Sequence, residues 1–151
     1  MSGSQYIYLN GEDVSRKIRS QDMSDMASRV ATMPKVREKL VDMQREIAKN
    51  NGIVMDGRDI GTFVLPNADF KFYIDASVDV RAERRMLQLQ EKGLNPDYYQ
   101  IREETEERDY RDRNRRVSPL VRADDAFYID TSAMSREEVV ETIMSKIKEG
   151  C

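Results

Sequence analysis

Residues 52–62 read Gly-Ile-Val-Met-Asp-Gly-Arg-Asp-Ile-Gly-Thr, a short apolar run that stops in a cluster of charges. The run 53–55 predicts a strand buried on both faces, because three consecutive apolar residues leave no polar side for water. Such strands belong to parallel sheets, and in open parallel α/β sheets ligands bind beyond the carboxyl ends of the strands. We therefore expect Asp56, Arg58 and Asp59 to project into a ligand site, with an exposed polar turn as the alternative.

The composition indicates a soluble globular protein with a highly charged surface, since 39% of its 151 residues are hydrophobic and 35% are charged. The net charge of −3 argues against a generally basic partner of nucleic acids or membranes. The chain has no His, and so lacks the usual neutral-pH general base and the commonest zinc ligand. Cys151 is the one cysteine and can form no internal disulfide, and nothing resembles a signal peptide or a membrane span. We expect a cytoplasmic protein.

Hydrophobic periodicity predicts alternating strands and helices. An edge strand at residues 5–9 should end in the hairpin-type turn signal Asn10-Gly11. Helices are expected at 21–32, from 34 to about 49, at 77–92, from 95 onward and from 135 onward, and strands at 70–75 and 127–130. The alternation from residue 53 onward is the βαβ pattern of an α/β fold with a parallel sheet.

Residue types that favour helix ends mark several boundaries. The expected N-caps are Ser20 and Ser77, the expected stop is Gly93, Asn95-Pro96 should begin a helix, and Ser135 with Glu138 should form a capping box.

The segment 102–116 is the most charged part of the chain, with six Arg and six acidic residues among 15 positions. Helical spacing places Arg108, Arg111, Asp112 and Arg115 on one face. The exclusive use of Arg for positive charge suits planar, bidentate recognition of phosphate oxygens. The alternative is a solvated helix with ion pairs at four-residue spacing.

Ser28 and Arg37 form a second, weaker candidate site. Ser28 could hydrogen-bond a ligand or its own helix backbone, and Arg37 could contact a ligand or remain solvated.

With these residues in view, the chain resembles the bacterial cytidylate kinases, a branch of the nucleoside monophosphate kinases. The resemblance runs from about Leu9 to the C-terminal helix. The matching stretches are Gly-Glu-Asp-Val-Ser at 11–15, Asp-Gly-Arg-Asp-Ile-Gly-Thr at 56–62, Arg-Arg-Met-Leu-Gln-Leu-Gln-Glu-Lys-Gly at 84–93, and Glu-Arg-Asp-Tyr-Arg-Asp-Arg-Asn-Arg at 107–115.

The resemblance implies a P-loop kinase-like α/β fold, a parallel sheet with helices on both faces, and phosphoryl transfer from ATP to CMP or dCMP with Mg²⁺. By this likeness, Ser28, Arg37 and Asp59 read the cytosine, Arg58 and Arg108 clamp the acceptor phosphate, Asp112 binds the ribose hydroxyls, and Arg115, with Arg111 and Arg113, belongs to a mobile lid at about 96–118. The arginines near 58 and 108–115 are then expected to meet around one phosphate. No metal ligand is expected from this chain.

One departure from the family pattern concerns the Gly-rich phosphate loop that ends in Lys and Ser or Thr. The 151 residues contain no such stretch. In kinases of this fold the strand before the loop is central, between the strands that correspond to 53–55 and 70–75, so we expect this strand to be missing. The chain alone should then have little kinase activity, and open strand edges should favour marginal stability or self-association.

The expected organisation is a cloning remnant at residues 1–4, an acceptor-binding region at 5–52 and an α/β core at 53–151. Two other functions stay open. A non-catalytic nucleotide- or RNA-binding module would explain the arginines of 108–116 but not the pair Arg58-Asp59. The second open function is that of a different P-loop kinase fragment, which would act on a small hydroxylated metabolite.

Overall fold

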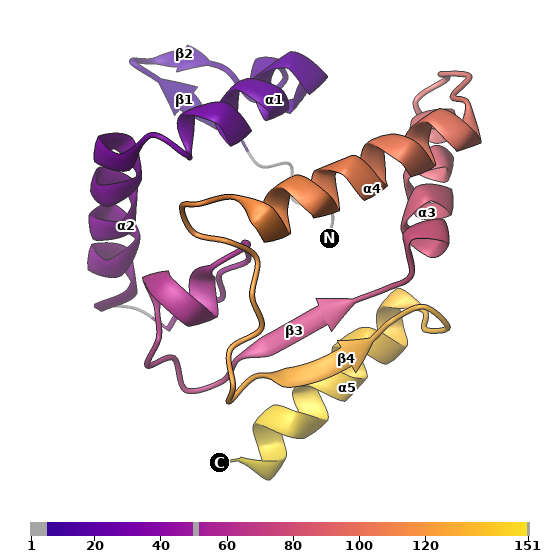
Figure 1. The fold of residues 1–151 in the computed structure, drawn as a ribbon. Coiled ribbons are helices and arrows are strands. Elements are labelled where there is room, and N and C mark those ends of the chain that lie inside the picture. The colour runs from indigo at the N-terminus through magenta and orange to yellow at the C-terminus, as the bar shows by residue number, and fades with distance from the viewer. Residues whose placement is uncertain (1–5, 50–51, 151) are drawn as a thin grey trace. The chain divides into compact units, whose positions relative to one another are not determined.

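The computed structural model describes residues 6–49 and 52–150, without the side chains of Gln21, Asp25 and Ser28. The suggested cloning remnant at 1–4 lies outside the described residues. The chain divides into two compact units, residues 1–53 and 54–151, and each is described by itself. Figure 1 labels their helices and strands.

The first unit opens with a hairpin of two short antiparallel strands, β1 (Tyr8–Leu9) and β2 (Glu12–Asp13). Asn10 and Gly11 form the turn, with φ of 52° and 86°. Both values are positive, and Asn and Gly are the residues that tolerate this conformation best. The predicted turn is confirmed. A single 3-10 turn, η1 (Lys17–Arg19), follows.

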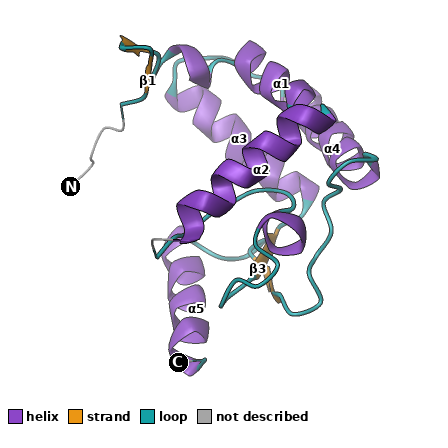
Figure 2. Cartoon of the chain, turned by 90° about the vertical axis from the view of Figure 1, so that its left-hand side faces the viewer, coloured by secondary structure: helices purple, strands orange, loops and turns teal. Residues whose placement is uncertain are grey.

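Two helices complete the first unit, α1 (Gln21–Val30) and α2 (Pro34–Lys49), which Figure 2 shows as separate rods. The Ser20 hydroxyl accepts a hydrogen bond from the Met23 amide, as expected of an N-cap. Pro34 is the first residue of α2, where its missing N–H costs nothing. The helix predicted at 21–32 ends two residues earlier, at Val30.

The predicted buried strand at 53–55 is wrong. These residues form no strand, and Val54 is fully exposed. An apolar run becomes a strand only beside a hydrogen-bonded neighbour, and no described residue pairs with it. The chain continues into a π-helical turn, η2 (Ile60–Val64), whose Val64 is buried.

Two parallel strands lie side by side in the second unit (Figure 1), β3 (Phe72–Asp75) and β4 (Phe127–Asp130). Both read Phe-Tyr-Ile-Asp, and the register pairs identical residues. The phenylalanine rings stack with centroids 5.7 Å apart and the tyrosine rings at 6.1 Å. The predicted parallel pairing is confirmed, although β3 begins two residues later than expected.

Three helices follow these strands along the chain: α3 (Val78–Glu91) and α4 (Tyr98–Asn114) lie between β3 and β4, and α5 (Arg136–Glu149) comes after β4. Ser77 caps α3, Gly93 follows it with φ of 77°, and Ser135 with Glu138 forms the capping box of α5, all as predicted. The predicted start of α4 at Asn95-Pro96 is wrong. Asp97 is its N-cap, because its Oδ1 accepts the Gln100 amide at 2.9 Å.

The core of the second unit is small. Its buried apolar side chains are Val64, Ala76, Ala82, Ile101 and Ile129. By contrast Ile74, Phe127 and Tyr128 of the two strands are about half-exposed. Parallel sheets normally have both faces covered, so this described pair leaves apolar surface open. Among residues 6–49 and 52–150, the helices are too short or too polar to cross a membrane.

Candidate functional site: an arginine cluster around Asp112

Asp112 lies near the end of α4, and only 11% of its side chain is exposed. Its Oδ2 is 2.9 Å from Nε of Arg58, which comes from the segment before η2. A buried carboxylate is costly unless it is paired. Arg58 therefore satisfies Asp112 and at the same time attaches the 54–59 segment to α4.

Two further guanidinium groups approach the same carboxylate. Nε of Arg108, one helical turn earlier, is 4.0 Å from Oδ2, and Nη1 of Arg115 is 3.8 Å from Oδ1. The structure thus brings arginines from two distant segments together. Arg108 is largely exposed, Arg58 is about half-exposed, and Arg115 is mostly covered. Three cations around one anion leave an excess of positive charge at this point of a chain with a negative net charge.

The turn after α4 holds Arg115 in place. Arg115 is the C-cap rather than a helical residue, and its Nε donates to the Ser118 carbonyl. Ser118 has φ of 52°, and the Leu120 amide donates to the Asp112 carbonyl at 2.8 Å. These bonds fold the turn back onto the last turn of the helix.

Arg111 and Arg113, the other predicted lid residues, are exposed side chains on α4. Neither has an ion pair with Asp112 among the described contacts.

Asp59 is buried at the start of η2, next to Arg58. Its carbonyl accepts from the amides of Phe63 at 2.9 Å and Val64 at 3.2 Å. Gly57 precedes this turn, and a Cβ there would lie 2.8 Å from Cγ1 of Ile60. The close packing explains why a residue without a side chain stands beside Arg58.

A second ion pair lies next to the cluster on α4. Arg81 of α3 donates from Nη1 to Oδ1 of Asp109 at 2.8 Å and from Nη2 to Oδ2. Burial alone raises the pKa of Asp109, but the hydrogen bonds and charge of Arg81, with the charges of Arg113 and Arg58, bring that pKa below its ordinary value. Asp109 therefore lies within the electrostatic reach of Arg58.

Comparison with known proteins identifies the chain. The profile of the family described as cytidylate kinase matches residues 1–149. The chain belongs to the cytidylate kinase family. It is 49% identical over 147 residues to cytidylate kinase 1 of Haemophilus influenzae, and 47% identical over 144 residues to cytidylate kinase of Caldicellulosiruptor bescii. It is 54% identical over 127 residues to cytidylate kinase 2 of H. influenzae.

These alignments cover 97%, 95% and 84% of the chain, but 64%, 64% and 57% of the relatives. The chain thus spans less than two thirds of the length of these curated cytidylate kinases. Family membership confirms the predicted P-loop kinase-like α/β fold class. The described residues contain the helices and a small parallel sheet of this fold.

Two of the residues expected to read the cytosine lie in the first unit. Ser28 is in α1, and its side chain is outside the described residues. Arg37 is half-buried in the first turn of α2, where its amide donates to the Met33 carbonyl at 2.9 Å. The recognition of a base by these residues stays a prediction.

Members of the cytidylate kinase family are expected to use ATP and Mg²⁺. Among the described residues, no group of three or more His, Cys, Asp or Glu side chains could hold a metal ion. The sequence also has no Gly-rich loop ending in Lys and Ser or Thr. We therefore assign none of the described residues to the triphosphate or its metal.

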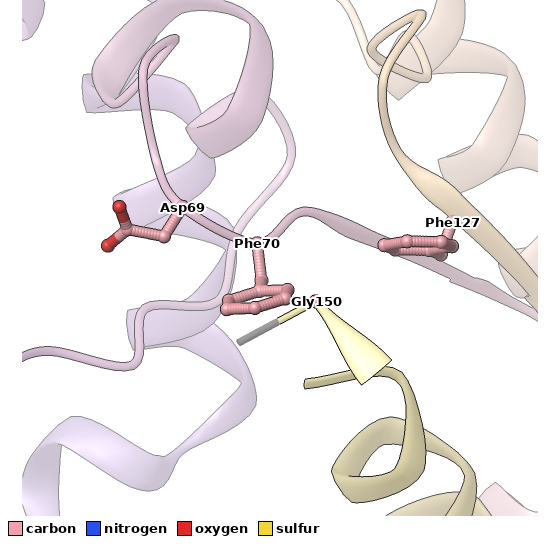
Figure 3. A pocket seen from close by; sticks show the side chains of 4 residues that line it. All are labelled: Asp69, Phe70, Phe127 and Gly150. Atoms are coloured by element: carbon pink, nitrogen blue, oxygen red, sulfur yellow. The ribbon is translucent and has the colours of Figure 1, made fainter. Parts of the chain in front are cut away.

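A pocket of about 670 Å³ lies at the amino ends of β3 and β4 and is lined by Asp69, Phe70, Phe127 and Gly150. Figure 3 shows the Asp69 carboxylate turned away from the Phe127 ring. Ligand sites of α/β sheets lie at the opposite, carboxyl ends of the strands. None of the predicted site residues lines this pocket. We therefore take the arginine cluster around Asp112, and not this pocket, as the candidate site.

Arg81 and Asp109 are the interacting residues that the sequence did not single out. Asp109 lies inside a matching stretch of the family, but nothing in the spacing connects it with a residue on another helix. One feature of the sequence could have pointed to Asp109: it lies three positions before Asp112, a second acidic residue, in a segment rich in Arg.

Proposed function

We propose that this chain supplies the acceptor side of phosphoryl transfer from ATP to CMP or dCMP. Arg58 and Arg108 hold the acceptor phosphate, and Arg115, which the family resemblance assigned to the lid, joins them in the same cluster. The observation that supports this proposal is the convergence of the three guanidinium groups on Asp112. Guanidinium forks match the oxygens of phosphate as well as those of a carboxylate. A phosphate monoester can therefore take the place that the carboxylate holds now.

In this proposal Asp112 keeps the arginines in position before the ligand arrives. When the phosphate binds, the arginines turn their donors to it, and Asp112 becomes able to accept hydrogen bonds from the ribose hydroxyls. Preorganised cations of this kind avoid the cost of assembling like charges at the moment of binding. The excess positive charge also favours a dianionic ligand over a neutral one.

The chemistry fits the residue types available. Phosphoryl transfer depends on positioning and charge neutralisation more than on a general base, so a chain without His loses nothing essential. Mg²⁺, when bound with ATP, supplies neutralisation at the phosphates of the donor. The residues of this chain hold and orient the acceptor. We expect little phosphoryl transfer from the 151-residue polypeptide alone, because it has no phosphate loop.

The proposal has three further parts. Ser28, Arg37 and Asp59 recognise the cytosine. Arg111 and Arg113 belong to a lid, and the protein is cytoplasmic. They are supported by the family resemblance and, for Asp59, by its burial beside Arg58.

Isothermal titration of the chain with CMP, UMP and AMP tests the proposal. We expect CMP to bind more tightly than UMP and AMP, with a modest dependence on salt. An RNA-binding module would instead bind single-stranded RNA with a steep salt dependence and little preference among the three nucleotides. Equal affinity for the three monophosphates would contradict the proposal.

A further inference from the structure

Arg81 is held by three hydrogen bonds between the end of β3 and α4. Its Nε donates to the Ala76 carbonyl at 3.0 Å, and its two Nη groups donate to the two oxygens of Asp109. Ala76 is buried and directly follows β3. All three nitrogens of the guanidinium are thus used, and the Asp109 side chain is only 16% exposed.

Asp109 and Asp112 lie three residues apart on α4, which places them on neighbouring positions of one helix face. Arg58 pairs with Asp112 at 2.9 Å, and the helical spacing brings Asp109 close to the same guanidinium. Two carboxylates of one helix can therefore compete for Arg58. In the structure Arg81 occupies both oxygens of Asp109, while Arg58 pairs with Asp112.

We propose that Arg81 is a positioning residue of the acceptor-phosphate site: by pairing with Asp109, it prevents this carboxylate from competing with Asp112 and with the phosphate for Arg58. This inference rests on the proposed function. Arg81 contacts no substrate in this account and acts only through Asp109. An unpaired Asp109 would draw Arg58 away from Asp112 and would repel an incoming phosphate.

The geometry requires Arg at this position. A lysine has its three N–H donors on a single nitrogen, which does not reproduce the planar fork that reaches the Ala76 carbonyl and both Asp109 oxygens. A purely structural pair between α3 and α4 makes a different prediction: its loss would lower the melting temperature but leave the affinity of the folded chain for CMP unchanged. The affinity for CMP, read beside the melting temperature, is therefore the decisive measurement.

The experiment compares the affinity for CMP of the 151-residue chain with that of Arg81→Met, Asp109→Asn and the double variant. We expect Arg81→Met to weaken binding on the order of tenfold. Asp109→Asn alone, and the double variant, should bind within about twofold of the original chain, because neither retains the competing charge. A double variant as weak as Arg81→Met would overturn the inference, and so would a tenfold loss in Asp109→Asn.

Arg84→Met is the matched control. Arg84 lies on the same helix, and its Nη2 donates to the Thr131 carbonyl at 2.6 Å. Its loss should lower the melting temperature without changing the affinity for CMP. Should Arg81→Met fail to fold, a tenfold loss of affinity in Asp109→Asn or in the double variant would still overturn the inference.

A second readout separates this inference from the proposed function. The Nε–Hε NMR resonance of Arg58 in the ligand-free chain should shift in Arg81→Met and return in the double variant. If CMP does not bind the original chain, the proposed function fails, while this resonance still reports whether Arg81 controls Arg58. An unchanged resonance in Arg81→Met would overturn the inference.

Discussion

Asp112 and Arg58 are joined by an ion pair of 2.9 Å that attaches the segment before η2 to the end of α4. Arg108 and Arg115 complete the surroundings of the same carboxylate. The three cations repel one another, and an anion between them stabilises the cluster. Asp112 supplies that anion in the absence of a ligand.

Asp112→Asn should leave the three guanidinium groups without their anion. We expect the free energy of unfolding to fall by about 2 kcal/mol, because a charge-assisted contact is lost and like charges remain close. Added inorganic phosphate should raise the melting temperature more in this variant than in the original chain, since it replaces the carboxylate. Asp125→Asn, which breaks the 2.6 Å pair with Lys71, is the control and should show no such added effect. The same response to phosphate in both variants would contradict the prediction.

The pairing of Asp109 predicts a defined loss of stability in acid. The pKa of this carboxyl is lower in the folded chain than its ordinary value of 3.8. The folded state then binds fewer protons than the unfolded state, so the pair contributes its full stabilisation above the ordinary value and loses it as the pH falls through the lower folded pKa. Urea unfolding of the original chain and of Asp109→Asn, from about pH 7 to about pH 3, measures this. The difference in free energy of unfolding between the two chains should be constant at neutral pH and shrink in acid. A difference that grows in acid would contradict a pKa of Asp109 that is lowered by folding.

Ser135 fixes the start of α5 through a reciprocal pair of bonds. The Glu138 amide donates to the Ser135 hydroxyl at 3.2 Å, and the Ser135 amide donates to Oε2 of Glu138 at 2.7 Å. Ser135→Ala should lower the free energy of unfolding by about 1 kcal/mol. Ser145→Ala, the same change inside the same helix, should have a much smaller effect. Equal losses in the two variants would show that the cap contributes nothing.

The open strands predict self-association of the chain. Ile74, Phe127 and Tyr128 are about half-exposed, and exposed apolar strands favour pairing with other chains. Sedimentation equilibrium should detect oligomers, and Ile74→Lys should reduce them because a charge on an open strand opposes pairing. Val140→Lys on α5 is the control. A monodisperse, cooperatively melting monomer would contradict this prediction.

The sequence predicted the features that depend on neighbouring residues. Ser20, Ser77, Gly93 and Ser135 act at helix ends through bonds to residues a few positions away, and the structure has all four as expected. Capping preferences alone predicted the wrong start for α4. Asn95 and Asp97 are both good N-cap residues, and the structure uses Asp97.

Features that depend on distant partners were harder to predict. The run 53–55 has the composition of a buried strand, but composition does not supply the neighbouring strand that pairing needs. The meeting of Arg58 with Asp112 was expected from family resemblance and not from spacing. The bond between Arg81 and Asp109 was not expected at all, because only the packing of α3 against α4 brings them together.

Phosphate recognition by the arginine cluster is tested most directly by comparing the binding of CMP with that of cytidine, which differ only by that phosphate. Titration calorimetry should show CMP binding the original chain about 100-fold more tightly than cytidine. In Arg58→Met this advantage should fall to about tenfold or less, whereas Arg122→Met, which removes a cation over the Tyr128 ring, should keep it. If CMP has the same advantage over cytidine in Arg58→Met as in the original chain, the cluster around Asp112 is not the phosphate site.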